Sequence, residues 1–128
     1  MARSSRGEIK IYDVLKAAGL NFEEEYVFKD LVSTSGYYLR FDFAVFDDND
    51  EIDFLIEYQG EQHYTAKPKF GGATGLRKQQ YNDAKKVEYC KAHGYKLVII
   101  PYWEEKFIDY DYIMKLAYDY WLLSKILI

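Results

Sequence analysis

The chain has 128 residues, 49% of them hydrophobic and 30% charged, which suits one folded domain over residues 1–128 with a buried core. Its formal net charge of −4 argues against a generic nucleic-acid binder. Cys90 is the only cysteine, so an intramolecular disulfide is excluded, and its thiol is expected to pack in the core. The sequence has no signal-peptide pattern and no apolar stretch long enough to span a bilayer, so we expect a cytoplasmic protein with no membrane partner.

The first half of the chain has the pattern of a helix followed by a three-stranded meander. Ser5 and Glu8 form a capping-box pattern ahead of apolar residues at helical spacing, and Gly19 ends that predicted helix. Three strand-like segments follow, at residues 22–31, 38–46 and 52–58. The turn-rich segments between them predict antiparallel hairpins, because only antiparallel strands can be joined by a short turn.

The second half predicts a further helix and strand, and then a last helix. Residues 65–75 are rich in glycine and contain a proline, so we expect an irregular loop there. A helix is predicted over residues 76–92, followed by a strand over 95–101 that is buried on both faces. Asp109 or Asp111 is expected to cap the last helix. The predicted fold class is α/β, in the order α-β-β-β-α-β, with a four-stranded mixed sheet flanked by helices and an additional C-terminal helix.

Two acidic residues stand inside apolar strand patterns, Asp42 in the second strand and Glu57 near the end of the third. A hairpin between these strands can bring their carboxylates together. Mg²⁺ prefers one or two carboxylates together with waters and substrate phosphate oxygens, so Asp42 and Glu57 are candidate ligands for Mg²⁺ or Mn²⁺. His63, just beyond the strand, is a candidate for proton transfer. The pattern predicts a metal-dependent site for phosphodiester hydrolysis.

Each of these residues also has a purely structural interpretation. Strand alternation predicts that Asp42 shares a face with Arg40, with the two neighbouring phenylalanines on the opposite face. A surface ion pair with Arg40 would then explain Asp42. Glu57 could be an acid that reaches the surface at a strand end, and His63 could cap that strand.

Charge is distributed unevenly along the chain. Residues 41–62 contain eight acidic residues and no basic one, whereas residues 67–96 contain eight basic residues and two acidic ones. An acidic pocket for a metal beside a basic strip for phosphates suits a metal-dependent nuclease. The residues expected to contact nucleic-acid phosphates are Lys67, Lys69, Arg77, Lys78 and Lys86. A solvated helix face is the alternative explanation of this strip.

The predicted element order and several segments resemble a known family. The segments are IEYQGEQHY, FGG, KVEYCKAHGYKLVIIPY and the following WE. They resemble the PD-(D/E)xK restriction-endonuclease-like nucleases, in particular small phage-encoded members similar to very-short-patch repair endonucleases and to homing endonucleases with an EDxHD pattern. The resemblance covers residues 5–113. It implies a restriction-endonuclease-like core, DNA as the partner, and a phage origin with the host cytoplasm as the location.

Carried over residue by residue, the EDxHD pattern implies four candidate catalytic positions, at Glu8, Asp42, His63 and Asp83. Glu57 occupies the position of the glutamate in the superfamily motif. Gln59 departs from that motif, which usually has lysine there, and a neutral amide cannot replace an ammonium group. Two positions have structural alternatives: Glu8 fits a helix cap, and Asp83 could form an ordinary surface pair with Lys86.

The sequence therefore predicts a Mg²⁺- or Mn²⁺-dependent DNA endonuclease that hydrolyses phosphodiester bonds with a metal-activated water. The alternative is a catalytically inactive protein with the nuclease fold that binds nucleic acid or a host protein, which Gln59 and the acidic net charge favour. The apolar segment 121–128 allows either a homo-oligomer through the C-terminal helix or packing on the chain's own sheet. No motif encodes which DNA structure or sequence is recognised.

Overall fold

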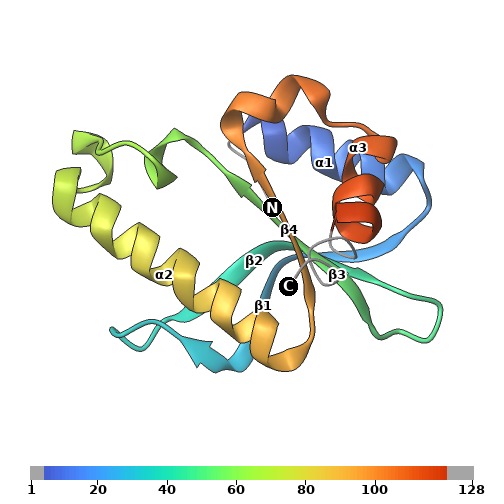
Figure 1. Cartoon of the computed structure of the whole chain (residues 1–128), viewed down its shortest axis with the longest axis horizontal. Helices are drawn as coiled ribbons and strands as arrows, with labels where there is room; N and C mark the ends of the chain where they lie inside the picture. The colour runs from blue at the N-terminus through green and yellow to red at the C-terminus, as the bar shows by residue number, and fades with distance from the viewer. Residues whose placement is uncertain (1–4, 121–128) are drawn as a thin grey trace.

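The computed structural model describes residues 5–120, which form a sheet with helices on both faces (Figure 1). The strands are β1 (Asn21–Val32), β2 (Tyr38–Phe46), β3 (Ile52–Gln59) and β4 (Lys96–Pro101). The α-helices are α1 (Arg6–Ala17), α2 (Gly72–His93) and α3 (Tyr110–Met114). The shorter helical segments are η1 (Glu61–His63), η2 (Pro68–Phe70), η3 (Tyr102–Phe107) and the π-helical η4 (Lys115–Tyr120). The predicted α-β-β-β-α-β order and the additional C-terminal helix are confirmed.

The four strands lie in the spatial order β1-β2-β3-β4. β1 and β3 both run antiparallel to β2, whereas β3 and β4 run parallel to each other. A parallel pair needs a long crossover connection, and α2 supplies it here. The predicted α/β class with a four-stranded mixed sheet is therefore confirmed.

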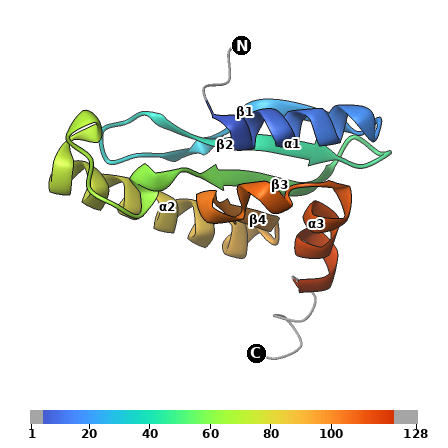
Figure 2. The same cartoon turned by 90° about the horizontal axis from the view of Figure 1, so that it is seen from above.

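Two apolar clusters join the helices to the sheet. The α1-side cluster contains Ile11 and Leu15 of α1 together with Ile113 of α3. The α2-side cluster, on the opposite face, contains Leu55 and Cys90. Figure 2 shows α1 and α2 on opposite sides of the sheet. Burial raises the pKa of the Cys90 thiol to about 12, and the predicted core position of this residue is confirmed.

Helix α1 begins at the predicted capping box. The Ser5 hydroxyl accepts a hydrogen bond from the Glu8 N–H at 3.1 Å and donates one to the Glu8 carboxylate at 2.6 Å. Gly7 is buried where α1 meets β3. Only glycine fits at this position, because a β-carbon would overlap the ring of Tyr58. The absent side chain lets the first turn of α1 lie directly against the end of β3, and this contact brings Glu8 close to the strand.

Helix α2 begins at Gly72, earlier than the predicted Leu76. The expected loop over residues 65–75 is therefore partly helical, and it also contains the 3₁₀ turn η2. Glycines normally indicate a break in a helix, which is why the prediction failed here. Gly75 has a different function, because a side chain at this position would collide with the Phe70 carbonyl. The glycine permits η2 and the first turn of α2 to pack tightly.

Strand β4 lies at the edge of the sheet and is only partly buried. Val98 and Ile100 belong to the α1-side cluster, whereas Ile99 is exposed. The prediction of a strand buried on both faces is therefore wrong, because the face that carries Ile99 is not fully covered at this edge of the sheet. The α2-side cluster reaches β4 through partly buried Leu97.

The last helical region begins at Asp109, one of the two predicted caps. Its side chain accepts a hydrogen bond from the Tyr112 N–H at 2.8 Å. The segment 121–128, which the sequence suggests as an oligomer contact, lies outside the described residues. In the part of the chain that the structure describes, no helix combines the length and the apolar character needed to cross a membrane.

Candidate active site

Strands β2 and β3 separate at the position of the two predicted metal ligands. Their antiparallel register ends at Phe43 paired with Ile56. Beyond this point β2 continues to pair with β1, and β3 with β4. In the resulting fork, the Asp42 carboxylate accepts a hydrogen bond of 2.7 Å from the N–H of Tyr58. The carboxylate of β2 thus takes the place that a backbone carbonyl would have in a continuous ladder.

The side chains of β2 change faces around Asp42. Phe41 packs in the α2-side cluster, whereas Phe43 packs in the α1-side cluster. Regular alternation would place both rings on one face, so the prediction for this part of β2 is wrong. On the neighbouring strand Glu25 has a φ of 50°, which marks a local irregularity in the paired backbone. The structural alternative for Asp42 is also wrong, since Arg40 forms its ion pair with Glu25, at 3.4 Å.

Glu57 lies on the face of β3 that α2 covers, and its carboxylate is buried. The Lys86 ammonium donates a hydrogen bond of 2.7 Å to Glu57 Oε1, and the Lys86 and Glu57 side chains are 10% and 6% exposed. Burial raises the pKa of Glu57 to about 8; the charge of Asp42 acts in the same direction and that of Lys86 opposes it. Lys86 thus differs from the exposed lysines of the basic strip, because its ammonium is buried beside Glu57, and its contact with a phosphate stays a prediction.

The pKa of Asp42 indicates which charges converge in the fork. Burial raises this pKa to about 6, and the hydrogen bond from Tyr58 opposes the rise. The negative charge of Glu8 raises the same pKa, whereas the charges of Lys86 and His63 lower it. Side chains from α1, α2 and η1 therefore act electrostatically on one carboxylate of β2.

His63 ends the short helix η1 and contacts Asp83 of α2. Its Nδ1 is 2.8 Å from Asp83 Oδ2, and the two side chains are 10% and 16% exposed. Gln79, one turn earlier on α2, donates to the other Asp83 oxygen at 3.1 Å. The alternative of a surface pair between Asp83 and Lys86 is wrong, because Lys86 reaches Glu57 instead. With Nδ1 directed to Asp83, Nε2 is the ring nitrogen that can exchange a proton with a substrate.

Gln59 is buried and has a structural partner. Its Oε1 accepts a hydrogen bond of 2.6 Å from the hydroxyl of Tyr64. The Tyr64 ring lies 4.8 Å from that of Trp103, measured between centroids. The ammonium that the structure places beside Glu57 is that of Lys86, which approaches from α2.

Lys86 is the site residue whose role the sequence prediction missed. Residues 79, 83, 86 and 90 recur three or four positions apart, which places them on one stripe of a helix. Cys90 is buried on this stripe, so the polar side chains that precede it must also face the sheet. This combination of a buried cysteine with polar residues at helical spacing is the signal that could have identified Lys86.

The other predicted phosphate contacts lie near the start of α2. Lys67 forms an ion pair with Glu61 at 2.8 Å, which offsets its charge. The Lys69 ammonium lies 5.7 Å from the centre of an exposed phenylalanine ring. Arg77 and Lys78 are exposed on α2. Lys69, Arg77 and Lys78 therefore all have the exposure that a contact with phosphate requires.

Comparisons of the chain with protein-family models, with curated proteins and with solved structures find no match. The resemblance to the PD-(D/E)xK nucleases stays a prediction, and the geometry of the site is what points to a function. This geometry has two parts: two carboxylates with a buried lysine, and a histidine held by an aspartate.

The donor set at the fork suits a hard divalent cation. Asp42 and Glu57 provide carboxylate oxygens from neighbouring strands, and burial together with their mutual repulsion raises the pKa of Glu57. Within residues 5–120 there is no group of three or more His, Cys, Asp or Glu side chains that could hold a metal ion. Mg²⁺ commonly takes one or two protein carboxylates and completes its shell with waters and phosphate oxygens, and the two carboxylates fit this kind of site.

Proposed function

We propose that this protein is a metal-dependent endonuclease that hydrolyses phosphodiester bonds in DNA. The observation that carries the proposal is the convergence of Asp42 and Glu57 with the Lys86 ammonium in the fork between β2 and β3. Burying several charged groups together is costly, and such clusters with perturbed pKa values are typical of functional sites. The restriction-endonuclease-like identity of the core belongs to this proposal.

Asp42 and Glu57 would hold Mg²⁺ or Mn²⁺ through their carboxylate oxygens. When bound, the ion supplies a Lewis acid that polarises a phosphoryl oxygen and lowers the pKa of a coordinated water. The charge of Glu8 adds to the negative potential at Asp42, which supports a cation at this position.

The remaining roles belong to side chains of α2 and η1. Lys86 orients Glu57 and offers positive charge to a phosphoryl oxygen that becomes more negative in the transition state. His63 accepts the proton of the attacking water, or donates one to the leaving oxygen, through Nε2. Asp83 is a positioning residue, because it holds the imidazole by Nδ1 and has no direct contact with the reacting atoms in this scheme.

The test is cleavage of labelled duplex, single-stranded and branched DNA with Mg²⁺ or Mn²⁺, with and without EDTA. Asp42→Asn keeps an oxygen that can accept from the Tyr58 N–H but removes the charge, and we expect the rate to fall at least about a hundredfold. Asp30→Asn is the matched control, since Asp30 is an exposed carboxylate that bonds Tyr89 outside the fork, and its rate should equal that of the native chain. Cleavage that survives EDTA or Asp42→Asn would refute the proposal.

A catalytically inactive binding protein with the same fold is the second candidate. Gln59 favours it, because an amide cannot replace the lysine of the superfamily motif, and so does the net charge of −4. The contact between Lys86 and Glu57 weakens the argument from Gln59, since an ammonium reaches the carboxylate from another element. The same assay separates the candidates: DNA binding without cleavage by either ion would favour the inactive protein.

A further inference from the structure

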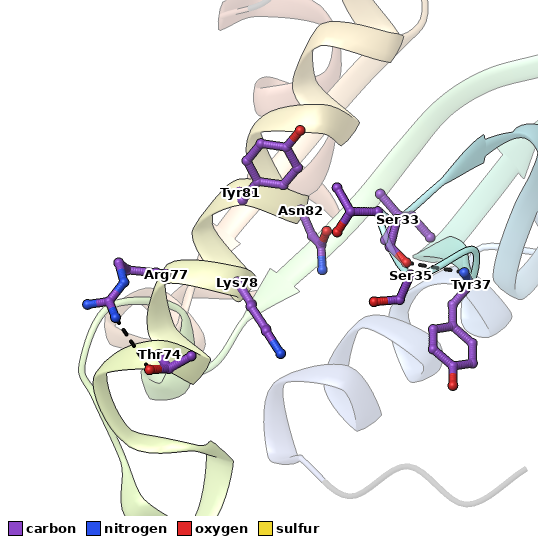
Figure 3. A pocket seen from close by; sticks show the side chains of 10 residues that line it. Ser33, Ser35, Tyr37, Thr74, Arg77, Lys78, Tyr81 and Asn82 are labelled. Carbon is purple, nitrogen blue, oxygen red and sulfur yellow. Dashed lines mark hydrogen bonds between the residues drawn. The ribbon is translucent and has the colours of Figure 1, made fainter.

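A pocket of about 550 Å³ lies between the turn that joins β1 to β2 and the first half of α2. This volume is in the range of pockets that bind small ligands. The walls contain Ser33, Ser35 and Tyr37 from the turn, and Lys78, Tyr81 and Asn82 from the helix (Figure 3). The lining includes two basic residues and no carboxylate, which distinguishes it from the acidic fork.

Hydrogen bonds within the turn and across to α2 fix the shape of this pocket. The Ser33 hydroxyl accepts from the Tyr37 N–H at 3.2 Å, and the Ser33 N–H donates to the Tyr37 carbonyl at 2.7 Å. The Lys85 ammonium donates to the Val32 carbonyl, which ties the end of β1 to α2. A ligand binds more favourably to a pocket that already exists, because no binding free energy is lost in ordering the protein around the ligand.

The lining carries the groups that recognise an unpaired nucleotide. Tyr37 and Tyr81 are exposed aromatic rings on which a base can stack. Lys78 extends from α2 into the space beside the turn, where its ammonium can meet a phosphate (Figure 3). Asn82 offers an amide that can donate to and accept from a base edge. Because bases are stacked and paired inside a duplex, this combination suits a single-stranded segment.

The pocket and the candidate active site lie on adjacent faces of one stretch of α2. Lys78 and Asn82 line the pocket, whereas the residues that follow them, Gln79 and Asp83, belong to the network that holds His63. A helix with its side chains is about 10–12 Å across, so a short run of nucleotides can reach from one face to the other.

We propose that this pocket binds an unpaired nucleotide of the strand that enters the fork, so that the nuclease selects DNA with a single-stranded segment. The selection of a substrate rests on the proposed function. The binding of a nucleotide by the pocket is independent of cleavage and can be measured separately.

Binding is measured with the Asp42→Asn protein in EDTA, by fluorescence anisotropy of a labelled oligothymidylate and of a blunt-ended duplex. We expect Tyr81→Ala and Lys78→Ala each to weaken oligothymidylate binding about tenfold, and to change duplex binding less than about twofold. Tyr110→Ala and Lys91→Ala alter exposed residues outside the pocket, and as matched controls they should leave both affinities unchanged.

Equal losses for the pocket variants and the controls would overturn the proposal, and so would equal losses for oligothymidylate and duplex. An abasic deoxyribose-phosphate oligomer tests the base directly: Lys78→Ala should weaken its binding, whereas Tyr81→Ala should not. Equal effects of Tyr81→Ala on the abasic oligomer and on oligothymidylate would also overturn it. If the native chain cleaves DNA but Tyr81→Ala leaves oligothymidylate binding intact, the pocket fails alone. If the chain cleaves nothing, the binding results still decide the pocket.

Discussion

Two regions of the molecule each bring a histidine beside an aspartate, but only one of the pairs is shielded from solvent. His63 Nδ1 is 2.8 Å from Asp83 Oδ2, with side chains 10% and 16% exposed. His93 Nε2 is 4.0 Å from Asp30 Oδ2, with side chains 41% and 69% exposed. Water and salt screen the second pair strongly, so its electrostatic interaction is weak.

The surroundings of the two pairs differ as much as their exposure. The ring of His93 is stacked on that of Tyr89, with 4.0 Å between centroids, and its Nδ1 donates to the Tyr89 carbonyl at 2.9 Å. The pair formed by His63 instead adjoins the half-buried Asp42 carboxylate and the buried Glu57 and Lys86 of the fork. Histidine next to aspartate is thus not enough to indicate a site. The convergence of several buried charges is the feature that distinguishes the fork.

Replacing each histidine by alanine should give the largest difference between the two regions in the rate of DNA cleavage. We expect His63→Ala to lower the rate of DNA cleavage about a thousandfold, because a general acid or base is removed. His93→Ala should leave the rate unchanged, since its ring is stacked on Tyr89 outside the fork. Single-turnover rates with Mg²⁺ provide the measurement, and circular dichroism checks that both variants fold. Similar rates for the two variants would show that the fork has no special catalytic role.

Two consecutive lysines of α2 provide a matched test of stability. Lys86→Met removes the cation that pairs with buried Glu57 and should lower the free energy of unfolding by about 3 kcal/mol. Lys85→Met removes a hydrogen bond to the Val32 carbonyl and should cost under about 1 kcal/mol. Urea denaturation measures both values. Adding Glu57→Leu to Lys86→Met should restore most of the loss, because no buried charge is left; no recovery would contradict the role of the ion pair.

The aspartates of the two pairs, Asp83 and Asp30, can be replaced to test whether each aspartate supports cleavage through its histidine. Asp83→Asn removes the charge that holds the His63 ring, and we expect the cleavage rate to fall about tenfold. Asp30→Asn alters an exposed aspartate outside the fork and should leave the rate unchanged. Equal single-turnover rates for Asp83→Asn and Asp30→Asn would contradict the positioning role of Asp83.

Most of the fold is predictable because its signals are local. The capping box at Ser5 and Glu8 and the cap at Asp109 involve side chains and N–H groups three residues apart, so the helix starts follow directly from the sequence. The start of α2 is not predictable in this way. The glycines at this start are typical of a loop. A side chain at Gly75 is excluded by the Phe70 carbonyl, and the sequence alone does not show that this carbonyl is so close.

The site is only partly predictable, because the role of Lys86 depends on a contact with a residue that is far away in the sequence. The hairpin brings Asp42 and Glu57 into neighbouring strands, and simple strand patterns are enough to expect this. Lys86 is 29 residues from its partner Glu57, whereas local helix rules favour Asp83 three residues before it. The change of faces in β2 is equally unpredictable from the sequence. The positive φ of Glu25 on the adjacent strand is uncommon for glutamate, and no neighbouring residue in the sequence indicates it.

The smallest expected effect compares one tyrosine from each region. The Tyr64 hydroxyl donates to buried Gln59 at 2.6 Å, and the Tyr89 hydroxyl donates to exposed Asp30 at 2.7 Å. Tyr64→Phe leaves a buried amide oxygen without this donor, so the free energy of unfolding should fall by about 1 kcal/mol. Tyr89→Phe should cost only a few tenths of that, since water replaces the lost donor at an exposed carboxylate. Equal losses of unfolding free energy in urea denaturation would mean that burial does not make hydrogen bonds near the fork stronger than those near Asp30. The difference in burial would then not explain the contrast between the two histidine–aspartate pairs.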